Sequence, residues 1–291
     1  MLNKHLFLSL LMAVSAATVS AETHHVHWSY TGENDAAHWG DLSEDFAVCK
    51  TGKQQSPVDF SAIKAVKSKQ LAYRYKIADY KVENNGHTLQ ATPQGKAQTI
   101  VINGKTYTFK QFHFHTPSEH TFKGKHFPME AHFVHQAEDG TLAVIGSVFK
   151  PGKNNPALSA LTAKKLKAGE SVTLKNLNIQ ALLPKNSKSF QLKGSLTTPP
   201  CSENVTWVVL KTPVQADAAQ FKAMRDIIGG ENNRPVQPLN DREVNENKKA
   251  PENGCFFNHI NQAFLLPNAA FTNALNKGWP LRGLEVNSGW N

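Results

Sequence analysis

One short segment places two histidines at a spacing that could bind a metal. Residues 111–115 read Gln-Phe-His-Phe-His. Successive side chains of a strand point to opposite faces, so His113 and His115 would share one face with Gln111. The two phenylalanines between them would point into a core on the other face.

A second segment, residues 130–135, reads Glu-Ala-His-Phe-Val-His. On a strand, His132 would share a face with Glu130 and Val134, and if the two strands pair, three imidazoles converge. Three neutral imidazoles with an open fourth position are what a catalytic zinc site requires, and each needs an acceptor for its other ring N–H. Gln111 and Glu130 each lie two residues from a histidine on the same strand. From these residues alone, paired surface histidines without a metal remain the alternative.

The chain around these segments has mostly the pattern of β-strands. Asn103-Gly104 separates the segments 99–102 and 105–115 and predicts a hairpin. The nearly continuous apolar runs 142–150 and 205–210 predict buried strands.

Two helices are expected. The first starts at Asn155 with Pro156 in its first turn, and the second covers about residues 216–228 and ends at Gly229-Gly230. No repeat or Pro/Gly/Ser-rich linker interrupts residues 28–243, so this stretch is expected to form one domain.

Composition excludes several classes of protein. The chain has 291 residues, 40% of them hydrophobic and 19% charged, which is too apolar for a disordered chain. Three cysteines and no Cys-x2-Cys pair exclude a disulfide-knot scaffold and a thiolate zinc site. The net charge is +9, but the lysines are spread along the chain, which favours a solvated basic surface over nucleic-acid binding.

The N-terminus has the pattern of an export signal. A short polar start with Lys4 precedes an apolar stretch over residues 6–14, and Val-Ser-Ala at 19–21 supplies the small residues of a cleavage site. We therefore expect a signal peptide over residues 1–21 and a periplasmic or secreted mature chain. No later apolar run is long enough to span a bilayer; a membrane-tethered N-terminus is the alternative.

Further segments closely resemble the α-class carbonic anhydrases, in the order of that family and over about residues 28–243. Beside 111–115 and 130–135, they are Gln-Ser-Pro-Val-Asp at 55–59, Asn-Asn-Gly-His at 84–87, Ser-Glu-His at 118–120, Gly-Ser-Leu-Thr-Thr-Pro-Pro at 194–200, Val-Thr-Trp at 205–207 and Asn-Asn-Arg-Pro-Val-Gln-Pro-Leu at 232–239. The resemblance implies a mixed α+β, β-dominated fold with a large, mainly antiparallel, twisted central sheet and short peripheral helices. It gives a domain over residues 22–244 and leaves 245–291 as a C-terminal extension of unknown structure.

The resemblance also implies an activity, the reversible hydration of carbon dioxide to bicarbonate and a proton. Zn²⁺, one per chain, would be held by His113, His115 and His132 with water as the fourth ligand. Carbonic anhydrase is itself the standard example of a zinc-bound water whose pKa falls to about 7, which provides a hydroxide nucleophile. The residues that support the three ligands would be Gln111, Glu130 and Asn232.

The family pattern assigns further roles by resemblance. The Thr197 hydroxyl would accept a hydrogen bond from the zinc-bound hydroxide and donate one to Glu119, and Thr198 would contact bicarbonate. An apolar pocket for CO2 would be lined by Val134, Val144, Leu196, Val205 and Trp207.

Proton export would use His87, because an imidazole titrates near neutral pH. The water between this shuttle and the zinc would be organised by Tyr30, Asn85 and Gln90. Cys49 and Cys201 match the disulfide of secreted bacterial members. The sequence departs from the family at Leu192, which replaces a tyrosine that usually supports the polar network around His120.

Three questions stay open in the sequence. Cys255 would be left over; a buried or free thiol is favoured over an intermolecular disulfide that would make a homodimer. Cleavage after Ala21 would expose Glu22-Thr23-His24, a pattern that can bind Cu²⁺ or Ni²⁺, although solvated terminal histidines are the favoured reading. The rival functions are a catalytically silent binding module and a periplasmic zinc or copper carrier, and the complete set of matched residues argues against both.

Overall fold

The computed structural model describes residues 26–61, 66–67, 71–73, 75–186 and 188–247. All of them belong to the first of the two units into which the chain divides, Met1–Glu252. Several expectations therefore lie outside the described residues: the signal peptide, the copper or nickel motif at 22–24, Cys255, and the extension beyond residue 247. Within the described part, no helix is long and apolar enough to cross a membrane.

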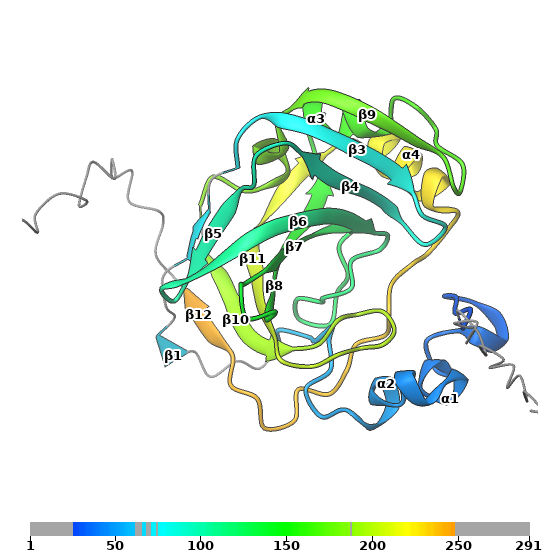
Figure 1. Cartoon of the computed structure of the whole chain (residues 1–291), viewed down its shortest axis with the longest axis vertical. Coiled ribbons are helices and arrows are strands. Elements are labelled where there is room, and N and C mark those ends of the chain that lie inside the picture. Colours follow the sequence, from blue (N-terminus) through cyan, green and yellow to red (C-terminus); the bar gives the residue numbers. More distant parts are fainter. Residues whose placement is uncertain (1–25, 62–65, 68–70, 74, 187, 248–291) are drawn as a thin grey trace, which may run out of the picture. The chain divides into compact units, whose positions relative to one another are not determined.

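Twelve strands form one twisted sheet (Figure 1). The main path runs β1-β12-β10-β11-β8-β7-β6-β4-β3-β9, and β5 pairs with both β2 and β6. Among the described pairs, β8 with β11 and β1 with β12 are parallel and all others are antiparallel. The β-dominated, mainly antiparallel fold expected from the sequence is confirmed. The strands are β1 Val66–Lys67, β2 Leu71–Tyr73, β3 Ala78–Asn84, β4 Leu89–Gln94, β5 Thr99–Ile102, β6 Lys105–His115, β7 Met129–Gln136, β8 Leu142–Pro151, β9 Ser171–Leu177, β10 Ser189–Gly194, β11 Val205–Ala216 and β12 Asn245–Asn247.

The helices of the described residues are few and short. The α-helices are α1 Trp39–Leu42, α2 Val48–Thr51, α3 Pro156–Thr162 and α4 Ala218–Ile228, and the 3-10 turns are η1 Gly32–Asn34, η2 Glu44–Phe46 and η3 Ile179–Leu182. Asn155 caps α3 as predicted, because its side chain accepts from the backbone N–H groups of the first turn.

The second predicted helix began two residues too early. Ala216 is the last residue of β11, and Asp217 caps α4 in a capping box with Gln220. The helix ends as predicted at Gly229, which has a left-handed φ of 91°.

Strand boundaries follow the turn residues. Asn103 and Gly104 both have positive φ, 56° and 82°, and join β5 to β6 in the predicted hairpin. The run 205–210 continues into a longer strand, β11, whose register shifts between Leu210 and Val214. Pro213 lies at this irregularity, where a residue without a backbone N–H is tolerated.

The two faces of β6 are used as the sequence predicted. Phe112 and Phe114 are fully buried on one face and join a core cluster that includes Phe133 of β7 and Tyr80 of β3. The opposite face of the same strands carries the histidines described below. Burial of these aromatic rings, each worth roughly 2 kcal/mol or more, fixes which face the histidines occupy.

The last described strand lies beyond the domain boundary expected from the sequence. Asn245–Asn247 form β12, which pairs antiparallel with β10 and parallel with β1. At least three residues assigned to the extension are therefore part of the sheet.

One histidine of the apolar core is held without charge. Nε2 of His135 lies 2.8 Å from the hydroxyl oxygen of Tyr75, and Nδ1 lies 3.3 Å from the carbonyl oxygen of Ala143. Burial lowers the pKa of His135 to about 3. Since an unfolded histidine titrates near 6.5, the unfolded chain binds a proton between pH 6.5 and 3 that the folded chain does not.

This difference predicts a measurable loss of stability in acid. The free energy of unfolding should fall as the pH drops from 6.5 toward 3, by about 3 kcal/mol at pH 4 from this residue alone. His135→Gln retains hydrogen-bonding groups but does not titrate, so its unfolding free energy should depend less on pH. Urea unfolding of both zinc-free proteins between pH 7.5 and 4 measures the slopes; equal slopes would show that His135 takes up its proton in the folded state.

Candidate metal centre

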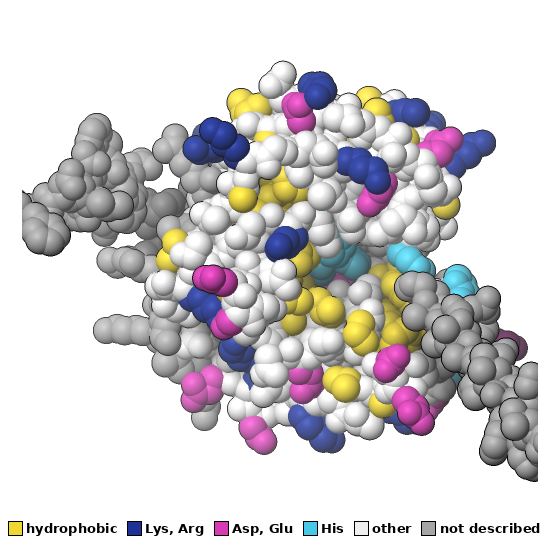
Figure 2. All heavy atoms as spheres, viewed as in Figure 1, with side chains coloured by type: hydrophobic (Ala, Val, Ile, Leu, Met, Phe, Trp, Pro, Cys, Tyr) yellow, Lys and Arg dark blue, Asp and Glu magenta, His cyan; other side chains and the backbone are white. Residues whose placement is uncertain are grey.

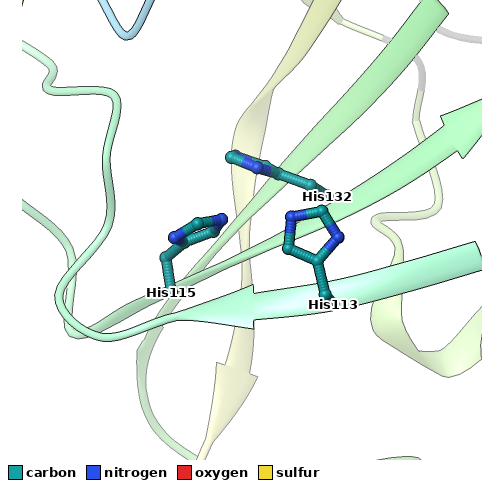
Figure 3. A group of neighbouring side chains, drawn as sticks. All are labelled: His113, His115 and His132. Atoms are coloured by element: carbon teal, nitrogen blue, oxygen red, sulfur yellow. The ribbon is translucent and has the colours of Figure 1, made fainter. Parts of the chain in front are cut away.

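β6 and β7 bring three imidazoles together. His113 lies directly opposite His132 in the antiparallel register, and His115 lies opposite Glu130. Figure 3 shows the rings of His113 and His115 rising from one strand and that of His132 from its neighbour, all pointing toward one another. Ring centroids are 5.1 Å apart for His113 and His115, 5.4 Å for His113 and His132, and 4.5 Å for His115 and His132. One ring nitrogen of each lies within 4.8 Å of the others.

The second ring nitrogen of each β6 histidine makes a hydrogen bond inside the protein. Nδ1 of His113 lies 2.8 Å from Oε1 of Gln111, and Nδ1 of His115 lies 2.7 Å from the backbone carbonyl oxygen of Asn232. Both Nδ1 atoms therefore carry the proton, which leaves both Nε2 atoms as lone-pair donors. Nε2 of His115 is buried without a hydrogen-bond partner among the described residues.

His132 is oriented the other way round. Its Nε2 lies 3.1 Å from Oε1 of Glu130, although the contact lacks hydrogen-bond geometry. With Nε2 directed at this carboxylate, Nδ1 is the nitrogen left for a metal. Oε2 of Glu130 accepts hydrogen bonds from the backbone N–H groups of Glu119 and His120, at 3.0 and 2.9 Å. Nδ1 of His120 lies 2.9 Å from Oε1. Burial alone would raise the pKa of Glu130, but His120 and His132 hold it well below its ordinary value.

Burial favours the neutral form of the two β6 imidazoles, His113 and His115. Burial, followed by the neighbouring rings of His115 and His132, lowers the pKa of His113 well below its ordinary value. Burial also lowers the pKa of His115. Uncharged imidazoles with free lone pairs suit a divalent cation of the zinc type, whereas Mg²⁺ and Ca²⁺ prefer oxygen ligands.

Gly146 makes room for the buried carboxylate, a role that we did not infer from the sequence. It pairs with His132 across β7 and β8, and a Cβ atom placed on it would lie 2.7 Å from Oε1 of Glu130. A glycine inside an apolar strand is the signal for such a close approach.

Glu119 is a second buried carboxylate beside the triad. Its Oε1 accepts a hydrogen bond of 2.8 Å from the backbone N–H of Arg234 and lies 3.5 Å from Nδ1 of His115. Oε2 lies 3.8 Å from Nδ1 of His132 and accepts no hydrogen bond among the described residues. Among the described residues, no hydrogen bond joins the side chains of Thr197 and Glu119.

The loop that carries Thr197 is fixed from several sides. The backbone carbonyl of Thr198 accepts a hydrogen bond of 2.8 Å from the N–H of Cys201. Cys201 forms a disulfide with Cys49, 152 residues earlier in the chain. Oγ of Ser195, at the start of the loop, accepts a hydrogen bond of 2.9 Å from the N–H of Ser56.

A row of apolar side chains runs across the sheet beside the triad. Val134 of β7 pairs with Val144 of β8, which pairs with Trp207 of β11. This row lies two residues from the row that contains His132, on the same face because of the strand alternation. All five residues expected to line a CO2 pocket belong to one apolar cluster: Val134, Val144, Leu196, Val205 and Trp207. Figure 2 shows histidine side chains in a hollow of this face, with hydrophobic side chains gathered on its flank.

His87 lies in the loop between β3 and β4. The side-chain oxygen of Asn85 accepts hydrogen bonds of 3.0 Å from the N–H groups of His87 and Thr88, which shapes this loop. The His87 ring stacks on Trp28, with centroids 3.8 Å apart and planes 8° from parallel. Burial, and then the proximity of His27, lowers the pKa of His87. We did not infer the role of Trp28 from the sequence, and no local pattern indicates it.

Two further residues, Gln90 and Tyr30, were expected to organise water near the triad. Gln90 of β4 pairs with His113 of β6, so it adjoins the metal ligands. Tyr30 packs edge-on against Trp28 and Trp39, with ring centroids 5.4 and 5.6 Å apart. Burial, followed by the charge of Glu119, raises the pKa of Tyr30 well above its ordinary value.

Comparisons with known proteins decide the family. Residues 34–248 match the family model described as eukaryotic-type carbonic anhydrase. A carbonic anhydrase of Neisseria gonorrhoeae is 45% identical over 238 residues, which cover 81% of this chain and 94% of the relative. The solved α-carbonic anhydrase of Thermovibrio ammonificans, in complex with sulfanilamide, is 45% identical with a TM-score of 0.70, covering 75% of this chain and 98% of that one.

The chain belongs to the carbonic anhydrase family. It is a carbonic anhydrase enzyme of the α class, as the sequence motifs predicted.

The fold alone would not have decided the activity. Dioscorin, solved in complex with ascorbate, is 28% identical to this carbonic anhydrase with a TM-score of 0.71, covering 78% of this chain and all of that one. One scaffold can carry different functions, so the activity has to be argued from the site. In this chain the site contains a complete buried histidine triad.

The hydrogen bond from His113 to Gln111 predicts a change in zinc affinity. Gln111→Ala removes the acceptor of the Nδ1 proton, so the ring should lose its fixed orientation and part of its basicity. The dissociation constant for zinc should rise roughly 10- to 100-fold.

Competition with a coloured chelator measures this constant. Gln94→Ala is the control, because Gln94 is exposed and, among the described residues, its side chain donates only to the carbonyls of Thr92 and Pro93. Equal zinc affinity in Gln111→Ala and the parent would contradict the assigned role.

Proposed function

We propose that this carbonic anhydrase hydrates CO2 reversibly on one zinc ion per chain, held by Nε2 of His113, Nε2 of His115 and Nδ1 of His132. The observation that carries the proposal is the convergence of three buried imidazoles whose other nitrogens all face acceptors. Zinc bound there supplies Lewis acidity that makes water a nucleophile near neutral pH.

The residues around the triad would hold the three histidine rings in fixed orientations, so that each ring presents a lone pair to the metal. Gln111 and the carbonyl of Asn232 each fix one ring by accepting its second N–H, and Oε1 of Glu130 faces Nε2 of His132 at 3.1 Å. Oxygen acceptors at these positions also make the free nitrogen a stronger donor.

Glu119 and Thr197 would orient the attacking water. Oε1 of Glu119 already accepts from the N–H of Arg234, whereas the buried Oε2 accepts no hydrogen bond among the described residues. We assign the hydroxyl hydrogen of Thr197 to this oxygen, which leaves the hydroxyl lone pairs to accept a hydrogen bond from water. Thr198 in the same loop would contact bicarbonate.

The apolar row would receive CO2, which is itself apolar and gains nothing from polar contacts. Val134, Val144 and Trp207 lie next to the triad on the same face of the sheet, and the other two apolar residues, Leu196 and Val205, belong to the same cluster. A dry wall at this point would hold the substrate carbon near the reacting water.

His87 would carry the released proton to solvent. It lies in a partly exposed loop, and its ring can exchange protons with both the cavity and bulk water. We assign Tyr30, Asn85 and Gln90 to the ordering of the water between His87 and the metal.

We also propose export to the periplasm or the exterior. The Cys49–Cys201 disulfide supports export, because such bonds persist in oxidising compartments. A homodimer through Cys255 stays a prediction of the sequence, since that residue is not described.

Removing the metal tests the function directly. Stopped-flow CO2 hydration by chelator-treated protein should fall more than ~10³-fold and return after addition of one zinc per chain. His115→Ala should show the same loss, whereas His38→Ala, a change at an exposed histidine outside the triad, should behave as the parent. Full activity of the zinc-free protein would refute the proposal.

The shuttle has a separate signature. His87→Ala should lower kcat in weak buffer by roughly 10²-fold, because water alone must then export the proton. Added imidazole should restore kcat, and kcat/KM should change little, since proton export follows the chemical step. A kcat independent of buffer concentration in His87→Ala would remove His87 from this role.

A further inference from the structure

The side-chain amide of Asn232 joins the loop of His87 to the strand of the metal ligands. Its Nδ2 donates to the backbone carbonyl of His87 at 3.1 Å and to that of Phe114 at 2.9 Å. Its Oδ1 accepts from the backbone N–H of Thr116 at 2.7 Å. Phe114 and Thr116 flank His115 along the chain, so one amide connects the backbones of the two sites.

The backbone of Asn232 reaches the metal centre as well. Its carbonyl oxygen is the acceptor for Nδ1 of His115. The same residue therefore orients a metal ligand through its main chain and contacts the proposed proton carrier through its side chain.

The amide of Asn232 has a single satisfactory orientation. A flipped amide would place its oxygen against two carbonyl oxygens and its NH2 group against an N–H donor. Only 1% of Asn232 is exposed, so water has little access to replace these bonds. Both N–H groups of the Asn232 amide donate hydrogen bonds, one to each backbone, which favours a rigid link between the His87 loop and β6.

We propose that the side chain of Asn232 is a positioning residue for proton export, because it holds the His87 loop at a fixed distance from the metal centre. This inference depends on the proposed shuttle role of His87. The rate of proton transfer through ordered water depends strongly on the distance between the donor and the acceptor. A loosened loop should therefore slow proton export without changing the attack on CO2.

The structure predicts a partial effect when this link is cut. Thr88 provides a second tie, since its Oγ1 donates to the carbonyl of Phe114 at 2.6 Å. The stack of the His87 ring on Trp28 is a third restraint, which the variant should weaken but not abolish. The loop of Asn232→Ala should therefore loosen rather than detach.

Four variants test the proposal in the zinc-loaded full chain: Asn232→Ala, His87→Ala, the double variant, and Asn155→Ala. Asn155 is the matched control, because it is also buried and its Nδ2 donates to two backbone carbonyls, of Ala181 and Gln215, at 2.8 and 3.5 Å. It caps α3 and has no described contact with the metal centre. Asn232→Ser serves if Asn232→Ala does not fold.

The expected result is a split between kinetic constants. Asn232→Ala should lower kcat in weak buffer by roughly three- to tenfold and recover with imidazole, with kcat/KM and bound zinc near those of the parent. In the His87→Ala background the second change should have no further effect on kcat. Asn155→Ala should lose stability but keep the parent kcat.

A spectroscopic measurement is independent of activity. The proton signals of the His87 ring should be shifted upfield by its stack on Trp28, and this shift should shrink in Asn232→Ala in zinc-free and zinc-loaded protein alike. It should be unchanged in Asn155→Ala.

Two outcomes would overturn the inference. One is a parent-like kcat and ring shift in Asn232→Ala while His87→Ala is slow. The other is an equal loss of kcat and kcat/KM in both backgrounds, which would place the effect at His115. A His87→Ala variant without buffer dependence would instead refute the shuttle itself, so the two failures are distinguishable.

Discussion

The structure depends on one constraint: a buried imidazole that offers one nitrogen to a metal must satisfy its other nitrogen inside the protein. Hydrogen bonds meet this need for His113 and His115, and the Glu130 carboxylate faces the second nitrogen of His132 at 3.1 Å. Gln111 on β6 and Glu130 on β7 each lie two residues from their histidine on the same strand, whereas the Asn232 carbonyl comes from the segment after α4. The sheet alone cannot build the site, because the third acceptor arrives from outside it.

The segment after α4 also carries a buried cation that connects the surroundings of the site. The Arg234 guanidinium donates to the side chain of Gln55 and to the backbone carbonyls of Ser56 and Cys49, at 2.8 to 2.9 Å. Burial lowers its pKa to about 10, and the charge of Glu119 opposes that shift. Neutral carbonyl oxygens thus solvate the buried guanidinium of Arg234, and the backbone N–H of the same residue binds Glu119. Arg234 therefore connects the segment of the disulfide residue Cys49 to the buried Glu119 carboxylate.

Local sequence patterns correctly predicted the features that depend on neighbouring residues in the chain. Alternation placed the two β6 histidines opposite Phe112 and Phe114, and Asn103-Gly104 fixed the hairpin. What the residues alone could not predict is register between distant strands. The parallel pairing of β8 with β11, the need for a glycine at 146, and the stack of Trp28 on His87 all arise from contacts between segments far apart in sequence. The family resemblance supplied the residue roles, because those depend on such contacts.

His120 supports the metal centre through Glu130, and Leu192 packs in the neighbouring part of the sheet. His120 directs Nδ1 toward Glu130, and its buried Nε2 has no hydrogen-bond partner among the described residues. Leu192 lies opposite Trp207 in the sheet, and the Trp207 ring packs 4.7 Å from that of His120. A buried polar atom without a partner costs on the order of 1–3 kcal/mol. Since Glu130 keeps its two backbone N–H donors, that cost falls on stability rather than on the orientation of His132.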